Sequence, residues 1–210
     1  MARFQCYLIQ PTLRAQRFLR RFRFGKGELL EGHPLGCHNA MVQIEDGDMQ
    51  VAPEYHDLKV YELTEPDVPR TDPRWPVKCD ACDYVFAPND EWQVYFEQYH
   101  RRADTGEVLT LKAMPPGAMW DAEWWRDSTG RGSGPDGLSL HVKLPDGSTW
   151  FVDGPASNCT RKDVPHNCWV REGDPPNVTI IGGANICGVG GGSIMTPQYH
   201  GFLRHGWLED

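Results

Sequence analysis

The sequence LSLHVKLPDGSTWFV, residues 138–152, carries the clearest secondary-structure signal in the chain. Every second residue from Leu138 to Leu144 is leucine or valine, which is the period of a β-strand with one buried face. Pro-Asp-Gly at 145–147 is typical of a tight turn, and residues 149–152 supply a returning strand. Residues 138–152 are therefore predicted to form a β-hairpin.

The residues that follow this hairpin combine turn formers with metal-ligand types and show little helical periodicity. They include NCTRKDVPHNCWVREG at 158–173 and GGANICGVGGGSI at 182–194. Zinc is held by deprotonated Cys or neutral His, usually by four donors in a tetrahedron. His166 and Cys168 lie two positions apart, which places both side chains on one face of an extended strand. One predicted zinc site consists of Cys159, His166, Cys168 and Cys187.

A second zinc site is predicted around the sequence KCDACDYVF. Cys79 and Cys82 form a Cys-x-x-Cys turn before a strand-like aromatic run, the pattern of a zinc knuckle in which two thiolates face one ion. The other two donors must come from elsewhere in the chain, and Cys37 with His38 (or His33) is the nearest candidate pair. The predicted ligands of this site are Cys37, His38, Cys79 and Cys82.

The cysteine content favours metal ligands and buried thiols over disulfides. The chain has seven cysteines, an odd number, and no secretory signal, so we expect a reducing compartment. Cys6 lies in an alternating, strand-like segment and is predicted to be a core residue. Disulfides remain the alternative for a protein that ends up in an extracellular particle.

Length and composition indicate a folded, β-rich protein. A chain of 210 residues can form one domain with its own core. The 8 Trp, 7 Tyr and 8 Phe argue against disorder, because such rings offset the entropy of ordering only when they are buried. The predicted fold class is α+β and β-rich: a compact, loop-rich domain of hairpins with one or two short helices, stapled by zinc.

Two segments are predicted to be those short helices. Residues 15–22 place apolar side chains at the i, i+3, i+4 and i+7 positions of an amphipathic helix. They follow a first predicted strand at 4–9, which Pro11 is expected to end. The sequence of residues 91–100 fits both a helix and a strand, and a potential N-cap at 89–90 favours the helix.

Charge is distributed unevenly along the chain. Residues 1–27 carry 7 of the 21 basic side chains and no acidic one, so a segment near +7 precedes a body near −15. This segment can pack on its own acidic body or meet an acidic partner such as nucleic acid. The predicted organisation is a basic segment at 1–27 and a single zinc-stapled domain at 28–210. The predicted partner-binding residues are Arg14, Arg17, Arg20, Arg21 and Arg23.

Catalysis is the competing class of function. A glycine-rich run follows Cys187, and His200 and His205 lie downstream, so a thiolate–imidazole pair with glycine N–H groups is conceivable. No nucleophile-elbow motif or cysteine-protease context accompanies these residues. A zinc- or cysteine-dependent hydrolase centred on Cys187 and His200 is therefore the alternative hypothesis, and the sequence leaves open whether the protein is an enzyme.

Several stretches of the chain also resemble a known group of proteins. They are PPGAMW at 115–120, NCTRKDVPHNCWVREG at 158–173, CGVGGGSI at 187–194 and YHGFL at 199–203. With these motifs the chain resembles, over about residues 75–210, uncharacterised proteins encoded by tailed bacteriophages and prophages. The resemblance implies a viral origin and assigns no catalytic residue.

The function expected from these observations is binding. The chain is predicted to be a phage-encoded zinc-binding protein, either a virion component or an infection-stage accessory protein. A viral or host protein is the expected partner, and nucleic acid is the second, through residues 1–27. No apolar run approaches the length of about 18 residues that a membrane span needs, so no membrane association is expected. The expected location is the host cytoplasm or the virion.

Overall fold

The computed structural model of the protein consists of short β-strands joined by turns and ordered loops. It describes residues 2–23, 37–44, 49–50, 68–123, 133–154, 156, 159–161, 163, 166–182, 187 and 192–210. The strands are β1 (Arg3–Gln5), β2 (Tyr7–Phe22), β3 (Asn39–Gln43), β4 (Met49–Gln50), β5 (Glu91–Arg102), β6 (Val108–Thr110), β7 (Ala118–Asp121), β8 (Leu140–Lys143), β9 (Thr149–Phe151), β10 (Val170–Glu172), β11 (Thr179–Ile181), β12 (Ser193–Met195), β13 (His200–Arg204) and β14 (Trp207–Glu209). The prediction of a β-rich fold is confirmed. Within these ranges no helix has the length and apolar character needed to cross a membrane.

The chain divides into two compact units. Unit 1 comprises Met1–Gln10 and His100–Asp210, and unit 2 comprises Pro11–Tyr99. Strands β2 and β5 each contribute residues to both units. The domain boundary predicted after residue 27 falls within 24–36, outside the residues that the structure describes.

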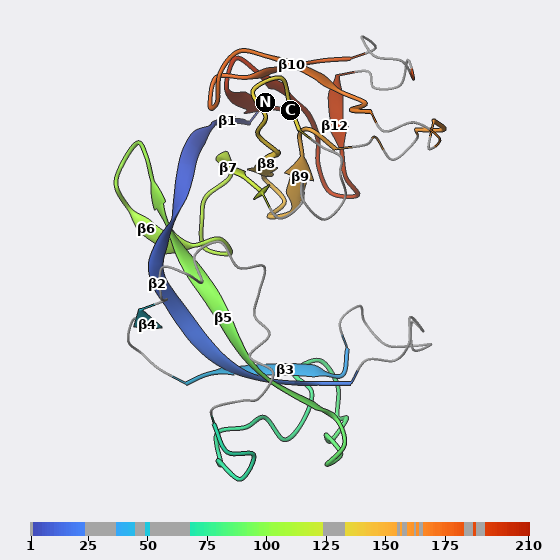
Figure 1. Ribbon diagram of the computed structural model, residues 1–210. Helices are drawn as coiled ribbons and strands as arrows, with labels where there is room; N and C mark the ends of the chain where they lie inside the picture. Colours follow the sequence, from blue (N-terminus) through green and yellow to red (C-terminus); the bar gives the residue numbers. More distant parts are fainter. Residues whose placement is uncertain are drawn as a thin grey trace. The chain divides into compact units, whose positions relative to one another are not determined.

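Unit 1 contains a four-stranded antiparallel sheet in the order β1-β14-β13-β12. Phe4 of β1 lies opposite Leu208 of β14, so the two ends of the chain lie side by side (Figure 1). One face of this sheet belongs to the core, because Ile194, Leu203 and Leu208 are fully buried. Cys6 packs in the same core, as predicted.

The predicted hairpin forms the second part of unit 1. Strands β8 and β9 pair antiparallel, with His141 opposite Phe151, and the turn between them places Gly147 at a φ of 83°. That left-handed backbone conformation favours glycine. Strand β7 pairs with β8 on one side and, in parallel, with the beginning of β2 on the other. The hairpin prediction is confirmed.

Unit 2 is built on the remainder of β2. Strand β3 pairs with its end, from Phe18 to Phe22, and Figure 1 shows the two strands running along each other. Leu19 and Val94 are fully buried in a core cluster that includes Trp75. The guanidinium group of Arg21 is buried in the same unit and lies 3.8 Å from the ring centre of Trp92.

The predicted helix at residues 15–22 is wrong, because these residues belong to β2. Ala15, Leu19 and Arg21 are buried at odd-numbered positions, as the two-residue period of a strand requires. The apolar side chains that suggested a helix therefore point to two faces of a strand. Pro11 lies inside β2 and does not end the first strand as expected.

The predicted helix at residues 91–100 is also wrong, because these residues belong to β5. Trp92, Val94 and Phe96 alternate into the core cluster of unit 2. Asp90 does not cap a helix; its Oδ2 atom accepts a hydrogen bond from the backbone N–H of Ala87 at 2.7 Å. The strand alternative that the sequence allowed for this segment is the observed one.

Candidate metal centres

Four predicted donors meet in unit 1 and form the C-terminal cluster: Cys159, His166, Cys168 and Cys187. Their ligand atoms all lie within 4.8 Å of one another. The Nε2 atom of His166 is 3.3 Å from Cys159 Sγ and 3.5 Å from Cys168 Sγ. A tetrahedral ion with metal–sulfur bonds of about 2.3 Å holds neighbouring donors about 3.5–3.8 Å apart. The cluster therefore has the donor set and the dimensions of a tetrahedral metal site.

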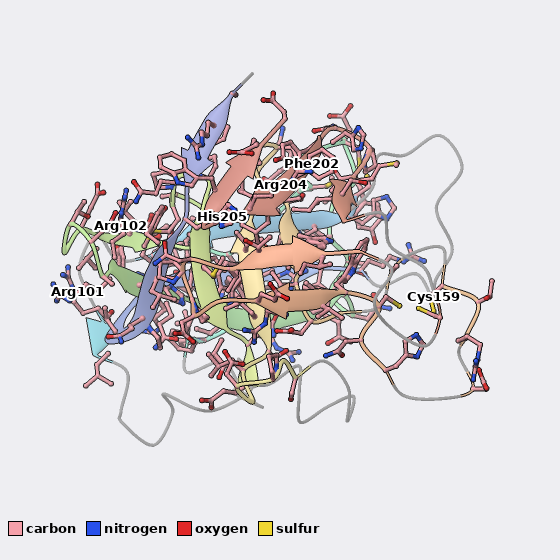
Figure 2. The ribbon with its side chains drawn as sticks, turned by 90° about the horizontal axis from the view of Figure 1, so that it is seen from above. Arg101, Arg102, Cys159, Phe202, Arg204 and His205 are labelled. Atoms are coloured by element: carbon pink, nitrogen blue, oxygen red, sulfur yellow. The ribbon has the colours of Figure 1, made fainter. Side chains whose placement is uncertain are left out.

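Loops and turns carry the donors of the C-terminal cluster. Figure 2 shows Cys159 on a loop outside the strands, and its N–H donates to the carbonyl of Ala156 at 3.0 Å. Cys168 precedes β10 and is fully buried. Asn167 lies between His166 and Cys168 in the sequence, and its side-chain amide donates a hydrogen bond to the carbonyl of Ser133 at 2.6 Å. Loops and turns, rather than strands of a sheet, thus position these donors.

A buried ion network fixes the strand that follows Cys168. The Arg171 Nε donates to Asp153 Oδ1 at 2.9 Å, and its Nη1 donates to Asp136 Oδ2 at 2.9 Å. The side chains of Arg171 and Asp153 are 2% and 4% exposed. Burial opposes the charge of Arg171, but the hydrogen bonds to Asp136 and Asp153 outweigh it and raise the pKa of Arg171. This network ties β10 to the β8–β9 hairpin.

Electrostatics in the C-terminal cluster oppose ionisation of its innermost thiol. Burial first, and then hydrogen bonding with the thiols of Cys159 and Cys187, raise the pKa of Cys168 to about 12. A divalent cation reverses this balance, because thiols bind metals as thiolates and release their protons. Metal binding at this cluster would therefore release a proton from Cys168.

The second group lies in unit 2 and is called the knuckle cluster. Of its four predicted donors, Cys37, His38, Cys79 and Cys82, the structure groups the first two with Cys82, and Cys79 is outside that group of converging ligand atoms. The ligand atoms of Cys37, His38 and Cys82 lie within 4.8 Å of one another, and the two sulfur atoms are 3.2 Å apart. Cys79 is buried and packs with both of these cysteines. The two sequence segments predicted to supply this site are thus brought together.

A short hairpin and its backbone donors shape the knuckle cluster. Lys78 bridges to Val85, and the N–H of Cys79 donates to the Tyr84 carbonyl at 2.9 Å. Cys79 Sγ accepts the N–H of His38 at 3.2 Å and that of Ala81 at 3.3 Å. Burial raises the pKa of Cys79, but backbone N–H donors, including that of Ala81, outweigh it and lower the pKa to about 7. The backbone therefore stabilises a thiolate at this position.

Two residues that the sequence did not single out support the knuckle cluster. Tyr84 stacks on the His38 ring at 4.0 Å between centroids, and its hydroxyl donates to Asp90 Oδ2 at 2.9 Å. His38 adopts a φ of 59°, a left-handed conformation that is uncommon outside glycine. The only sequence signal for this support is the aromatic residue two positions after Cys82.

Of the described residues named for the alternative hypothesis, Cys187 belongs to the C-terminal cluster and His200 belongs to neither cluster. His33 and the glycine run at 188–191 lie beyond the described residues. The histidine grouped with Cys187 is His166. His200 lies on β13, where its ring is tilted against Phe202 at 6.3 Å.

The predicted partner-binding arginines are divided between interior and surface. They are Arg14, Arg17, Arg20, Arg21 and Arg23. Arg21 is 5% exposed and donates to two backbone carbonyls, a position that does not suit contact with a partner. Arg20 and Arg23 also donate hydrogen bonds within unit 2. Arg14 is exposed, with its guanidinium 5.3 Å from the centre of the Tyr99 ring.

No protein-family model, curated protein or solved structure matches this chain. Two Cys/His clusters are the chemical features from which its function is inferred. Both are dominated by thiols, which select soft or borderline cations over magnesium or calcium.

Proposed function

We propose that the protein is a zinc-binding protein in which one Zn²⁺ ion in each unit has a structural role. The observation that carries this proposal is the C-terminal cluster, whose four donors lie within 4.8 Å of one another. Cys3His is a common donor set of structural zinc sites, and four protein donors leave no position for a reacting water. The knuckle cluster has the same donor types.

The proposed role of the whole chain is binding, as a phage-encoded virion component or infection-stage accessory protein. The motifs at 115–120 and 158–173 support a viral origin by resemblance. A viral or host protein is the proposed partner, and the host cytoplasm or the virion is the proposed location. Mass spectrometry of purified virus particles distinguishes the two roles: peptides of this chain at a constant copy number support a virion component.

Metal analysis of the untagged protein tests the zinc proposal. We expect two zinc ions per chain, and one ion each after Cys79→Ser and Cys168→Ser. Substitution by Co²⁺ should give the strong visible absorption of a tetrahedral, thiolate-rich site in both units. A chain that purifies without zinc, or whose zinc content is unchanged by both substitutions, contradicts the proposal.

A hydrolase centred on Cys187 and His200 is the second hypothesis. It requires either an open zinc position or a free thiolate beside a histidine. Cys187 is instead one of four converging donors, and the grouped histidine, His166, contacts two other thiols. The geometry therefore favours the structural role for this site.

A further inference from the structure

The four-stranded sheet of unit 1 turns one face to solvent. Ile194, Leu203 and Leu208 point to the core and are fully buried, so their strand neighbours point the opposite way. On that opposite face, Met195 is 73% exposed and the Arg3 side chain is 55% exposed. The β13–β14 face is defined here by Arg3, Met195, His200, Phe202, Arg204 and Trp207.

Two arginine–aromatic stacks lie on the β13–β14 face. The Arg3 guanidinium lies 4.1 Å from the centre of the Trp207 ring, and the Arg204 guanidinium lies 4.1 Å from that of Phe202. Trp207 and Phe202 belong to β14 and β13, the two central strands of the sheet. Figure 2 shows Phe202 and Arg204 close together on the sheet.

The register of β13 and β14 sets the spacing between the rings of Phe202 and Trp207. Phe202 lies directly opposite Glu209, so Trp207, two residues before Glu209, is its diagonal neighbour. Diagonal neighbours in an antiparallel sheet are about 7–8 Å apart. Two neighbouring planar groups of one extended ligand can therefore each contact one of the two arginine–aromatic stacks.

Charge on this face favours an anionic ligand. Glu209 is the only acidic side chain that the four strands place on it, and its carboxylate binds Arg3 Nε at 2.9 Å. Arg204 is exposed and, within the part of the chain that the structure describes, its contact is the Phe202 ring rather than an ion pair. His200 adds a polar ring on the same strand.

We infer that the β13–β14 face binds single-stranded nucleic acid. Unpaired bases stack on aromatic rings and on guanidinium planes, and arginines bind the phosphates between them. A four-stranded sheet with aromatic residues on its central strands is one of the surfaces that provide this combination. This surface is separate from the two metal clusters, and its arginines, Arg3 and Arg204, are not among the five predicted between residues 14 and 23.

Fluorescence anisotropy with labelled oligothymidylate and oligouridylate at low salt tests this inference on the full-length protein. We expect both oligomers to bind and a duplex of equal length to compete poorly, because its bases are not available for stacking. Tighter binding of the DNA or of the RNA oligomer identifies the natural ligand. Absence of binding by both oligomers, the result expected if the face serves a protein partner, overturns the inference.

Variants of the face separate stacking from general charge. Phe202→Leu should weaken binding by about ten-fold, the effect of losing one stacked base. Arg204→Ala should weaken binding and reduce the salt dependence of the logarithm of the affinity by about 0.7, one phosphate contact to a single strand. Arg101→Ala is the matched control, since it removes an exposed arginine that Figure 2 shows away from Phe202. An equal loss of affinity in Arg101→Ala and Arg204→Ala contradicts a specific face.

Discussion

The C-terminal cluster and the knuckle cluster have the same donor types but are held in different ways. In the knuckle cluster, backbone hydrogen bonds join the two donor segments: Asp80 donates to Asn39, and His38 donates to Cys79 Sγ. In the C-terminal cluster, the donors lie on loops held by contacts such as the hydrogen bond from Asn167 to Ser133. Backbone hydrogen bonds thus join the two donor segments of the knuckle cluster, whereas the donors of the C-terminal cluster meet through loops.

The pKa values of Cys79 in the knuckle cluster and Cys168 in the C-terminal cluster also differ. Backbone donors outweigh burial at Cys79 and lower its pKa to about 7, whereas burial dominates at Cys168 and raises its pKa to about 12. The knuckle cluster also holds a thiol that resists ionisation, because burial and the hydrogen bond with Cys82 raise the pKa of Cys37 to about 11. Similar donor sets can therefore hold thiols of very different acidity.

Removal of metal should produce the largest effect and should affect unit 1 more than unit 2. Structural zinc contributes about 10–16 kcal/mol to the folding of isolated fingers, and the donors of the C-terminal cluster lie outside the strands. We expect Cys168→Ser to expose residues 156–187 to hydrogen exchange, and Cys82→Ser to leave most of β3 and β5 protected. Hydrogen exchange measured by mass spectrometry distinguishes the two variants. Equal deprotection of both units contradicts the comparison.

Loss of Arg171 should have the next largest effect. Arg171→Met leaves the carboxylate of Asp153, 4% exposed, without its cation, and breaking a buried ion pair costs about 3–5 kcal/mol. The variant should unfold at lower urea concentration and bind zinc more weakly at the C-terminal cluster, while the affinity of the knuckle cluster is unchanged. Urea unfolding and competition with a chromogenic chelator measure the two effects.

Arg102→Met is the control for this prediction. Arg102 also pairs with two carboxylates in unit 1, Asp104 and Glu107, but both of those are substantially exposed. Such surface pairs contribute about 0–1 kcal/mol. If Arg102→Met and Arg171→Met destabilise the protein equally, the buried network has no special role near the C-terminal cluster.

Arginines in the interior also explain why part of the fold was not predicted. The strand pattern of β2 requires Arg21 on the buried side, where its guanidinium lies between the rings of Trp92 and Phe86. Sequence periodicity treats arginine as a surface residue, so residues 15–22 fit a helix better than a strand. The β8–β9 hairpin was predictable because its alternation and its Pro-Asp-Gly turn agree.

The sequence predicted the donor residues of the two metal clusters but not the residues that surround and support them. Cysteine and histidine are few in this chain, so their local spacing indicated both groups. The support of His38 by Tyr84, and the tie between Arg171 and Asp153, depend on pairs of residues brought together by folding. Spacing along the chain contains no signal for such contacts, although it did place His166 with Cys187 in one predicted site, and the structure groups these two residues.

A buried histidine should give unit 1 an acid sensitivity that is independent of its metal. Burial lowers the pKa of His141 to about 4, and the residue is 1% exposed between Trp120 and Phe151. Between pH 6.5 and 4 the unfolded chain binds a proton that the folded chain does not, so stability falls as the pH is lowered through this range. The expected loss is at most about 3 kcal/mol.

His141→Phe keeps the ring contacts and removes this proton. Urea unfolding of the wild type and the variant at pH 7 and pH 4.5, with the same metal content, should show a smaller loss of stability in the variant. Metal release in acid, which protonates the ligands of both clusters, affects the two proteins alike. Identical losses would assign the acid sensitivity of unit 1 to its metal ligands alone.

The smallest effect is expected at the edge of the knuckle cluster. Tyr84→Phe retains the ring that stacks on His38 and removes the hydroxyl that donates to Asp90 at 2.9 Å. The variant loses this hydrogen bond and the one that Arg23 donates to the same hydroxyl at 3.3 Å. The loss should cost about 1–2 kcal/mol and lower the zinc affinity of the knuckle cluster by less than ten-fold.

Tyr99→Phe is the matched control for Tyr84→Phe. Tyr99→Phe removes another tyrosine hydroxyl of unit 2, which accepts a hydrogen bond from Gln16 at 2.6 Å, and should leave both zinc affinities unchanged. The C-terminal cluster should be unaffected by either variant. A loss of knuckle affinity of a hundred-fold or more in Tyr84→Phe would mean that side chains, rather than backbone N–H groups, preorganise this cluster, because the donors to Cys79 Sγ remain in the variant.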